Sequence, residues 1–489
     1  MPRTRPAFDH LVVLMMENRG FDHLMGYLYE RDPPARFVPP HDPVFRGVAG
    51  RSDLGCWDSQ DPPRFWPAHR APWATVADMN VPFPDPGEAH TPHMHHQLFG
   101  VDEVDPDPAR RPETPPMSGF VTDYVRVARR RAWAAGRKGV TDQALAEEIM
   151  RCYPPEATPV LSGLARAYAV SDAFFASVPS CTYPNRSFLH AADSSGWVDN
   201  EPYPRWSQNQ ATTIFQRLSD ALPPGRDWAV FWDPQDRVPL TRLIHRPLYD
   251  HSFDNRFLDM EQFEARCAEG DLPAYSFVQP RILLNNNDMH PAYFAGQTTW
   301  SSVLGGERLI ARVYDALRRG PAWERTFFVI LFDEHGGTYD HAPPPAATPP
   351  HRAPPYPLEH GFRFDRLGCR VPAVFVSPYI EAGTVFRAEG PAPLEHCSVI
   401  RTLCEVFGLE PLTDRDRAAP DLLGVLTRDT PRRDAPAFTP RPCEALPDDQ
   451  ARRAPLIGLQ RAILSLAAHR EGRLTLDLER IGQALDLIF

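Results

Sequence analysis

The sequence predicts an α/β fold in which a large, mostly parallel central sheet carries helices on both faces. Three observations support this prediction. The chain has 489 residues and a hydrophobic content of 42%, which is enough to bury a large core. Two long apolar runs, His10–Met16 and Arg325–Phe332, are typical of strands that are buried on both faces. Strand-like and helix-like segments alternate along the chain, as they do in parallel sheets.

The remaining elements are predicted from apolar periodicity. Short buried strands are expected at Trp228–Trp232, Tyr275–Val278 and Val371–Val376. Helices are expected at Phe21–Tyr29, Gln143–Cys152, Pro159–Tyr168, Thr212–Leu222, Glu307–Arg318, Ala454–His469 and Leu474–Phe489. Ala169–Phe175 is compatible with either a strand or a turn.

Proline-rich segments interrupt this pattern. The chain contains 56 prolines, roughly twice the average share, and they cluster at 33–43, 62–92, 106–116, 343–357 and 431–442. We interpret these segments as ordered insertions around the strand ends. Disordered linkers are the alternative, and it stays fully open for residues 343–357.

The length of the chain permits one elaborated domain or two to three smaller ones. We predict a main domain at residues 1–425, with insertions at about 30–140 and 197–270. Residues 426–489 are expected to form a linker and a helical extension packed on that domain.

Charge and composition exclude several classes of protein. Lys and Arg minus Asp and Glu give 52 − 63 = −11, so the chain has no general attraction to nucleic acid. No signal peptide and no transmembrane segment is visible, so we expect a cytoplasmic location, with export by another route still open. Eight cysteines without a C-x-x-C pair predict neither a zinc knuckle nor a disulfide framework.

Polar pairs follow the two long apolar runs. Glu17 and Asn18 come directly after the first run, and Asp333 and Glu334 come directly after the second. The carboxyl ends of parallel strands are where open α/β sheets bind ligands. Carboxylate and amide oxygens at such an edge predict a site for one divalent metal ion. The alternative is that Glu17 and Asn18 are a helix N-terminal charge and cap.

The segment Thr182-Tyr-Pro-Asn-Arg186 predicts a helix N-terminus. Pro184 suits the first helical turn, and Thr182 stands where an N-cap is expected. Backbone N–H groups at such an end favour a phosphate, with Arg186 as a fixed cation and Thr182 as a nucleophile. The alternative is that Thr182 only caps the helix.

Histidines crowd three loops. His335 and His341 follow the Asp333-Glu334 pair, and His290 lies in Asn285–Pro291, where it is either a functional group or a hydrogen-bonding post. A third loop holds His90, His93, His95 and His96, whose spacing suits either a structural metal or a solvated loop. The basic run Arg126–Lys138 is interpreted as a solvated helix face rather than a nucleic-acid contact.

Several of these motifs together carry a resemblance. They are, in chain order, Val13-Leu-Met-Met-Glu-Asn-Arg-Gly-Phe-Asp-His23, Pro179-Ser-Cys-Thr-Tyr-Pro-Asn-Arg186, Asn287-Asp-Met-His-Pro291, Asp333-Glu-His-Gly-Gly-Thr-Tyr-Asp-His341, Val371–Tyr379 and Glu395–Arg401. From about His10 to Leu409 the chain resembles the bacterial phosphoesterase family of non-specific phospholipases C and acid phosphatases, within the alkaline-phosphatase-like superfamily.

The resemblance implies a role for each motif residue. Glu17, Asn18, Asp333 and Glu334 match the family's metal ligands, and Thr182 matches the nucleophile that also touches the metal. His290 and His341 match catalytic histidines. The residues expected to bind substrate are Arg186, Asn185, His93 and His335. The metal is expected to be a single divalent ion: Ca²⁺, Mg²⁺, Mn²⁺ or Zn²⁺.

One segment departs from the family pattern. Many members carry Asp-Pro-Gly-His, with a histidine that contacts the phosphate, whereas this chain has Asp85-Pro86-Gly87-Glu88. Either His90 or His93 replaces that histidine, or Glu88 marks a subgroup with another substrate.

The resemblance implies a metal-dependent phosphoric-ester hydrolase that acts through a phospho-threonine intermediate. Its substrate is expected to be a phospholipid or a small phosphoester, and an aromatic lid around Trp57–Trp73 would favour lipid. The alternatives are a phosphatase or phosphodiesterase for a soluble cytoplasmic metabolite, and a catalytically idle binding or assembly protein on the same scaffold. The oligomeric state is not predicted.

Overall fold

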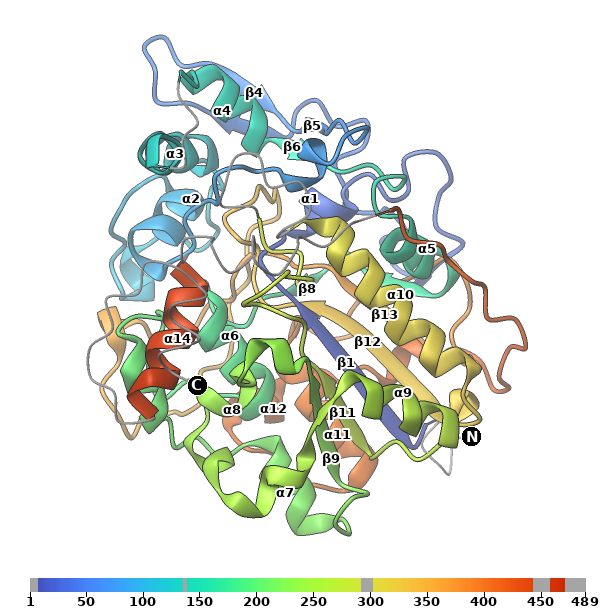
Figure 1. Ribbon diagram of the computed structural model, residues 1–489. Coiled ribbons are helices and arrows are strands. Elements are labelled where there is room, and N and C mark those ends of the chain that lie inside the picture. The colour runs from blue at the N-terminus through green and yellow to red at the C-terminus, as the bar shows by residue number, and fades with distance from the viewer. Residues whose placement is uncertain (1–7, 135–138, 292–301, 443–457, 471–489) are drawn as a thin grey trace.

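A computed structural model describes residues 8–134, 139–291, 302–442 and 458–470. Its centre is a nine-stranded sheet (Figure 1). The strands lie in the order β10 (Phe257–Asp259), β9 (Trp228–Trp232), β11 (Tyr275–Val278), β1 (His10–Met16), β12 (Thr326–Phe332), β13 (Ala373–Val376), β7 (Ala169–Ser171), β14 (Thr384–Phe386) and β2 (Arg36–Val38). The sheet confirms the predicted α/β class.

The sheet is mostly parallel, with one reversed strand. β13 runs antiparallel to both of its neighbours, β12 and β7. The other neighbouring pairs are parallel. Hydrophobic periodicity shows that a segment is a buried strand but carries no information on its direction, so the sequence could not reveal this reversal.

Helices pack on the sheet in two layers. Figure 1 shows α10 in front of the central strands and α11 behind them. One layer contains α5 (Pro159–Ala167), α9 (Met260–Glu269) and α10 (Val303–Arg319), and α10 contacts the other two. The other layer contains α6 (Thr182–Ala191), α7 (Ile214–Ala221) and α11 (Cys397–Phe407), and α6 contacts both of its neighbours.

Shorter elements surround these layers. The remaining helices are α1 (Phe21–Met25), α2 (His95–Phe99), α3 (Phe120–Ala134), α4 (Asp142–Ile149), α8 (Leu240–Leu243), α12 (Asp414–Ala418) and α14 (Gly458–Arg470). Small two-stranded sheets are formed by β3 (Gly55–Trp57) with β4 (Phe65–Pro67), β5 (His69–Arg70) with β6 (Arg151–Cys152), and β8 (Phe174–Phe175) with β15 (Leu394–Glu395).

Several element predictions need correction at their ends. The helix predicted over Phe21–Tyr29 ends at Met25, and the helix predicted over Gln143–Cys152 ends at Ile149 because Arg151 and Cys152 pair as β6. Ala169–Phe175 forms two separate strands, β7 and β8. The helix predicted at Leu474–Phe489 lies outside the described residues, as does part of the basic run Arg126–Lys138.

The register between β1 and β12 positions the site. Both strands are fully buried, and His10 pairs with Thr326 while Met16 pairs with Phe332, so the two strands end side by side. The segment that includes α2 to α4 lies beyond the carboxyl end of β1 (Figure 1). Polar groups at this edge are therefore enclosed by protein.

The proline-rich segment at residues 343–357 is held against the main body. Ala347 N donates to Asp365 O at 2.9 Å, and the Tyr356 hydroxyl donates to Asp193 Oδ1 at 2.5 Å. These bonds favour an ordered insertion over a disordered linker. No helix among the described residues is both long and apolar enough to cross a membrane.

Candidate active site

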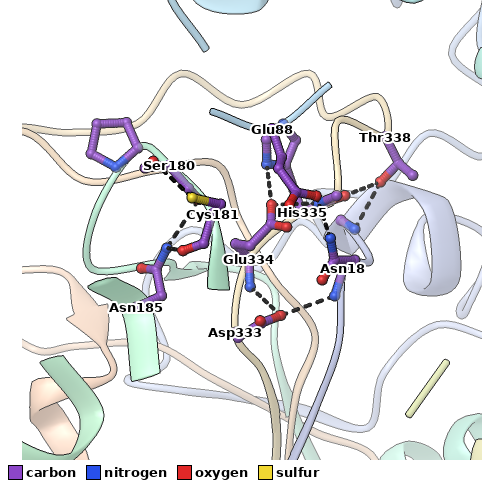
Figure 2. Close-up of polar contacts among 12 residues, drawn as sticks. Asn18, Glu88, Ser180, Cys181, Asn185, Asp333, Glu334, His335 and Thr338 are labelled. Carbon is purple, nitrogen blue, oxygen red and sulfur yellow. Dashed lines mark hydrogen bonds and ion pairs between the residues drawn. The ribbon is translucent and has the colours of Figure 1, made fainter. Parts of the chain in front are cut away.

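The ends of β1 and β12 bring the two predicted polar pairs together. Asp333 Oδ1 accepts hydrogen bonds from the backbone N of Asn18, at 2.9 Å, and from that of Glu334, at 2.8 Å. Figure 2 shows Asp333 below these two residues, whose side chains point the same way. All three are buried, as is Glu17. We call Glu17, Asn18, Thr182, Asp333 and Glu334 the strand-end site.

The backbone explains why an asparagine and a glycine pair stand here. Asn18 has φ of 53°, in the left-handed region that asparagine tolerates better than most residues. Gly336 has φ of 60°, and a Cβ there would lie 2.2 Å from the Asn18 carbonyl oxygen. The helix that follows, α1, has Gly20 at its N-cap, so neither Glu17 nor Asn18 caps it. The alternative in which Asn18 is the helix cap is therefore wrong.

Thr182 is the first residue of α6, and Cys181 is the N-cap. The prediction that Thr182 occupies the N-cap position was therefore wrong by one residue. Its hydroxyl makes no capping bond and instead donates to Glu17 Oε2 at 3.1 Å. The whole of α6 is buried, and the bond to Glu17 places the Thr182 hydroxyl inside the strand-end site.

Arg186 is the cation of the site. Its Nε donates to Glu17 Oε1 at 2.8 Å and lies 4.0 Å from Asp333 Oδ2. Its Nη1 is buried and has no hydrogen-bond partner. One guanidinium therefore balances part of the negative charge and keeps a donor for another ligand.

The carboxylates carry more negative charge than Arg186 can balance. Burial raises the pKa of Glu17 well above its ordinary value. The charge of Arg186 lowers this pKa, and the charge of Asp333 raises it further. Burial and then the charges of Glu88 and Asp333 raise the pKa of Glu334 in the same way. Such shifts reflect carboxyl groups that are buried close together, a setting in which a nearby positive charge favours their charged forms.

Unpaired oxygens test whether a metal fits. Asn18 Oδ1, Asp333 Oδ2 and Glu334 Oε1 are buried and have no hydrogen-bond partner. Buried polar atoms are nearly always bonded, so three orphans in one place point to a missing ligand. Amide and carboxylate oxygens are what hard divalent cations prefer. The residues present therefore fit a metal. Glu17, Asp333 and Glu334 do not, however, place three ligand atoms within 4.8 Å of one another. Three other groups of acidic and histidine residues do so.

Asn185 was predicted to bind substrate, and the structure supports a different role. Its Oδ1 accepts from Val178 N at 2.9 Å, and its Nδ2 donates to the carbonyls of Val178, Ser180 and Cys181, each at 3.1 Å. Figure 2 shows the bonds to Ser180 and Cys181. The amide is used within the loop, so Asn185 positions the segment that carries Thr182.

His335 and His93 lie beside the site with their own partners. His335 Nε2 bonds with Gln97 Oε1 at 2.8 Å, its Nδ1 lies 3.3 Å from Glu334 Oε2, and burial lowers its pKa to about 3. His93 Nδ1 bonds with Asp123 Oδ1 at 3.0 Å, and its ring packs against Gly87. The predicted contacts of both histidines with substrate stay predictions.

His290 belongs to a cluster that the sequence did not predict. Its ligand atoms and those of Asp85 and Glu88 lie within 4.8 Å of one another, and we call these three residues the Glu88 cluster. Glu88 Oε2 also accepts from Asn18 Nδ2 at 2.5 Å, so this cluster adjoins the strand-end site. Asp85 and Glu88 were noted only as a departure from the family motif. The sequence feature that could have revealed this cluster is an acidic residue on each side of the Pro-Gly turn, at positions 85 and 88.

His341 lies in a different environment from the one predicted. Its Nδ1 bonds with Asp22 Oδ2 at 2.6 Å, and Arg370 bonds with both Asp22 and Asp340, each at 3.0 Å. We call these four residues the Arg370 cluster. These contacts place His341 in an ion-pair network, and its catalytic role stays a prediction.

The histidines of the 90–96 loop do not gather around one point. His90 Nδ1 bonds with Pro179 O at 2.8 Å, and His96 Nδ1 with Asp102 Oδ1 at 2.7 Å, while His95 Nδ1 accepts from Val104 N at 3.2 Å. Among the described residues they form no cluster that could hold a metal. The structural-metal alternative for this loop is therefore not supported.

Comparisons with known proteins place the chain in a family. A model of the Phosphoesterase family matches residues 8–410. Non-specific phospholipase C3 of Arabidopsis thaliana is 33% identical over 441 residues, which are 88% of this chain and 75% of that protein. Non-specific phospholipase C5 of the same plant is 33% identical over 480 residues, which are 94% and 82%.

Among solved structures, a protein in the alkaline phosphatase superfamily from Vibrio parahaemolyticus aligns with 54% of this chain and 64% of that chain. The identity is 15% and the TM-score 0.33, a likeness too weak to bear on the site.

The fold is an α/β sheet with acidic residues at its carboxyl edge, and one family model matches most of the length of the chain. Together these findings define a phosphoric-ester hydrolase. The chain belongs to the phosphoesterase family, and the resemblance seen in the sequence is confirmed.

Proposed function

We propose that the protein is a metal-dependent hydrolase of phospholipase C type that acts through a phospho-threonine intermediate on Thr182. One observation carries this proposal: the buried Thr182 hydroxyl bonds with Glu17, within a set of buried oxygens that have no partner. A nucleophile beside an unfilled oxygen cage is the arrangement that metal-assisted phosphoryl transfer needs.

Four side chains, those of Glu17, Asn18, Asp333 and Glu334, would hold the metal. A bound divalent cation would lower the pKa of the Thr182 hydroxyl and polarise a phosphoryl oxygen. The bond to Glu17 Oε2 fixes the direction of the Thr182 hydroxyl, and the bonds from Asn18 and Glu334 fix the carboxylate of Asp333.

The chain's own groups carry out the reaction. Thr182 Oγ1 gives its proton to Glu17 Oε2, which accepts its hydrogen bond, and forms a bond to phosphorus as the bond from phosphorus to the leaving alcohol breaks. The unpaired Nη1 of Arg186 is available to a phosphoryl oxygen. His290 gives a proton to the leaving oxygen. A water then attacks phosphorus and gives its proton to His290, while the released Thr182 oxygen takes its proton back from Glu17.

A lipid is the proposed substrate. The exposed large hydrophobic side chains among the described residues all fall in the first insertion, which lies beyond the carboxyl edge of the sheet: Val44, Trp57, Trp73 and Val101. Tryptophan is enriched where proteins meet lipid interfaces, so these exposed side chains favour a lipid substrate. The relatives in Arabidopsis thaliana are named phospholipases C. The proposed cleavage is at the glycerol side, releasing diacylglycerol and a phosphorylated headgroup.

The test compares three substrates with purified protein and added Mn²⁺ or Ca²⁺: 4-nitrophenyl phosphate, bis(4-nitrophenyl) phosphate and phosphatidylcholine vesicles. We expect diacylglycerol from phosphatidylcholine at a higher kcat/KM than either soluble ester gives. Preference for the soluble monoester would overturn the lipid assignment. No turnover of any substrate by metal-loaded protein would favour an idle scaffold and contradict the whole proposal.

A further inference from the structure

We propose that Asp199 is a positioning residue for the nucleophile, because it ties the turn before Thr182 to two other segments of the protein. This inference rests on the proposed function, in which Thr182 attacks phosphorus. We call residues Pro179–Thr182 the Thr182 turn. The hydrogen bonds of Asp199 to described residues include Ser180 of this turn and not Thr182, so Asp199 acts through the segment that carries the nucleophile.

The Thr182 turn keeps its shape through bonds within its own segment. Asn185 Nδ2 donates to the carbonyls of Ser180 and Cys181, each at 3.1 Å, and Figure 2 shows this amide pointing toward them. These bonds join residues of one short segment, so they would move together with it. The place of the turn in the protein therefore depends on bonds to other segments.

The loop after α6 supplies such bonds. Asp199 Oδ1 accepts from the Ser180 hydroxyl at 3.2 Å, and Asn200 Oδ1 accepts from Tyr183 N at 2.7 Å. Asn200 N also donates to Cys181 Sγ at 3.2 Å. Because the side chain of Cys181 makes no capping bond, the backbone N–H in the first turn of α6 is capped from outside the helix. Asp199 and Asn200 thus hold the turn on both sides of the nucleophile.

Asp199 is itself fixed by two further segments. Its Oδ1 accepts from His90 N at 2.9 Å, and its Oδ2 bonds with His360 Nε2 at 3.0 Å. Its backbone N donates to Glu359 Oε2 at 3.1 Å, and its carbonyl accepts from Arg205 Nη2 at 2.6 Å. Because both carboxylate oxygens and both backbone groups of Asp199 have partners, its position is fixed from several directions.

Charge strengthens the bond between Asp199 and His360. The hydrogen bond to Asp199 raises the pKa of His360 above its ordinary value. Burial raises the pKa of Asp199, but the bonds from His360 and His90 lower it by more, so that it ends below its ordinary value. Hydrogen bonds between charged groups are stronger than those between neutral ones. Protonated His360 therefore holds Asp199 more firmly than neutral His360 does.

The other titratable groups near His360 do not take the place of Asp199. Glu359 favours the charged form of His360, but Arg205 already bonds with both oxygens of Glu359, at 2.6 and 2.8 Å. His90 and His95 also lie near His360, and burial lowers the pKa of both, that of His95 to about 3. Asp199 is thus the partner through which protonation of His360 reaches the Thr182 turn.

A second aspartate–histidine pair lies beyond the other end of α6. His351 Nε2 bonds with Asp193 Oδ2 at 3.0 Å, and this bond raises the pKa of His351 above its ordinary value. Asp193 comes just after the C-terminal end of α6, whereas the Thr182 turn precedes its N-terminal end. The pair has the same chemistry and no bond to the turn among the described residues, so it is a matched control.

The test measures hydrogen exchange and turnover of metal-loaded, full-length protein, with thermal unfolding to verify folding. We expect Asp199→Ala to speed exchange in peptides that cover the Thr182 turn. It should also lower kcat for 4-nitrophenyl phosphate by about 10²-fold with little change in KM, because the nucleophile is misplaced while the substrate contacts remain. Asp199→Asn keeps the oxygen that accepts from Ser180 and should lose less. Asp193→Ala should change neither the exchange of the turn nor kcat.

The dependence on pH gives a second measurement. The ratio of kcat for the wild type to kcat for His360→Gln should be largest below the folded pKa of His360. It should fall toward unity as pH rises through that pKa, because neutral His360 holds Asp199 less firmly. His351→Gln should give a ratio near unity at every pH.

The outcomes separate this inference from the proposed function. Wild-type exchange of the Thr182 turn in both folded variants, Asp199→Ala and Asp199→Asn, would overturn the inference. An equal loss of kcat in Asp193→Ala would also overturn it, and a ratio for His360→Gln that is constant with pH would overturn the part assigned to protonation. Wild-type turnover that Asp199→Ala leaves intact would contradict this inference alone, whereas no turnover by the wild type would contradict the proposed function.

Discussion

The strand-end site and the Arg370 cluster are built from the same two segments and have opposite chemistry. The segment after β1 supplies Glu17 to the first and Asp22 to the second. The segment after β12 supplies Asp333 to the first and Asp340 to the second. Both pairs of acids are buried. Composition therefore does not distinguish the proposed metal site from a cluster of buried ion pairs.

The difference lies in how the charge is balanced. In the Arg370 cluster one guanidinium bonds with two aspartates, and a histidine bonds with one of them. In the strand-end site Arg186 donates to Glu17 and lies 4.0 Å from Asp333 Oδ2, and one oxygen each of Asp333 and Glu334 has no hydrogen-bond partner. Burial does raise the pKa of Asp340 to about 6 against the charge of Arg370, so the balance in that cluster is incomplete but far closer.

The largest expected effect is at the nucleophile. Thr182→Ala should lower turnover of 4-nitrophenyl phosphate by about 10³-fold or more, because the covalent route is lost. Thr182→Ser keeps a hydroxyl and is the matched control, with most activity retained. If the alanine variant keeps near-wild-type turnover while its circular dichroism is unchanged, Thr182 is not the nucleophile.

Next is a paired substitution that compares the two clusters directly. Asp333→Asn removes a proposed metal ligand and should weaken Mn²⁺ binding and turnover by more than the ~100-fold that loss of a supporting residue costs. Asp340→Asn should leave Mn²⁺ binding unchanged and instead lower the free energy of unfolding by about 3 kcal/mol, because Arg370 loses a buried partner. Dialysis and urea titration measure the two quantities. A loss of metal in both variants, or in neither, would remove the distinction between the clusters.

The smallest effect concerns the group in which Arg205 bonds with Glu359 and His360 bonds with Asp199. The hydrogen bond to Asp199 raises the pKa of His360 above its ordinary value. Protonated His360 therefore stabilises the fold fully below the unfolded pKa of about 6.5, and the contribution is lost as pH rises through the folded pKa. His360→Gln should lower stability at pH 5.5 to 6 by at most about 1 kcal/mol and less at pH 9, as for other exposed pairs. Urea titrations at both pH values would contradict this if the loss were larger at pH 9.

The sequence predicted much of the sheet and the strand-end site because both depend on local pattern. β1, β9 and β11 match their predicted bounds, because a run of apolar side chains is stable only in the buried interior. The polar pairs after β1 and β12 follow from where those runs end. Thr182 was misplaced by one residue because Cys181, a poor capping residue, takes the N-cap.

Other features could not be predicted because they depend on contacts between distant segments. The Glu88 cluster joins the first insertion to the loop that carries His290, and Asp85 lies more than 200 positions before that histidine. The partnership of His341 with Asp22 and Arg370 also joins three separate segments. Motif spacing records which residues are present, and it does not record which arginine neutralises them.

The most direct test of the central claim is to trap the covalent intermediate. Metal-loaded protein would be mixed with 4-nitrophenyl phosphate, quenched in acid within the first turnover, digested, and analysed by mass spectrometry. The account predicts one phosphoryl group on the peptide that contains Thr182, and none on that peptide from Thr182→Ala. A phosphoryl group on another residue, or a burst of product with no phosphopeptide, would contradict it.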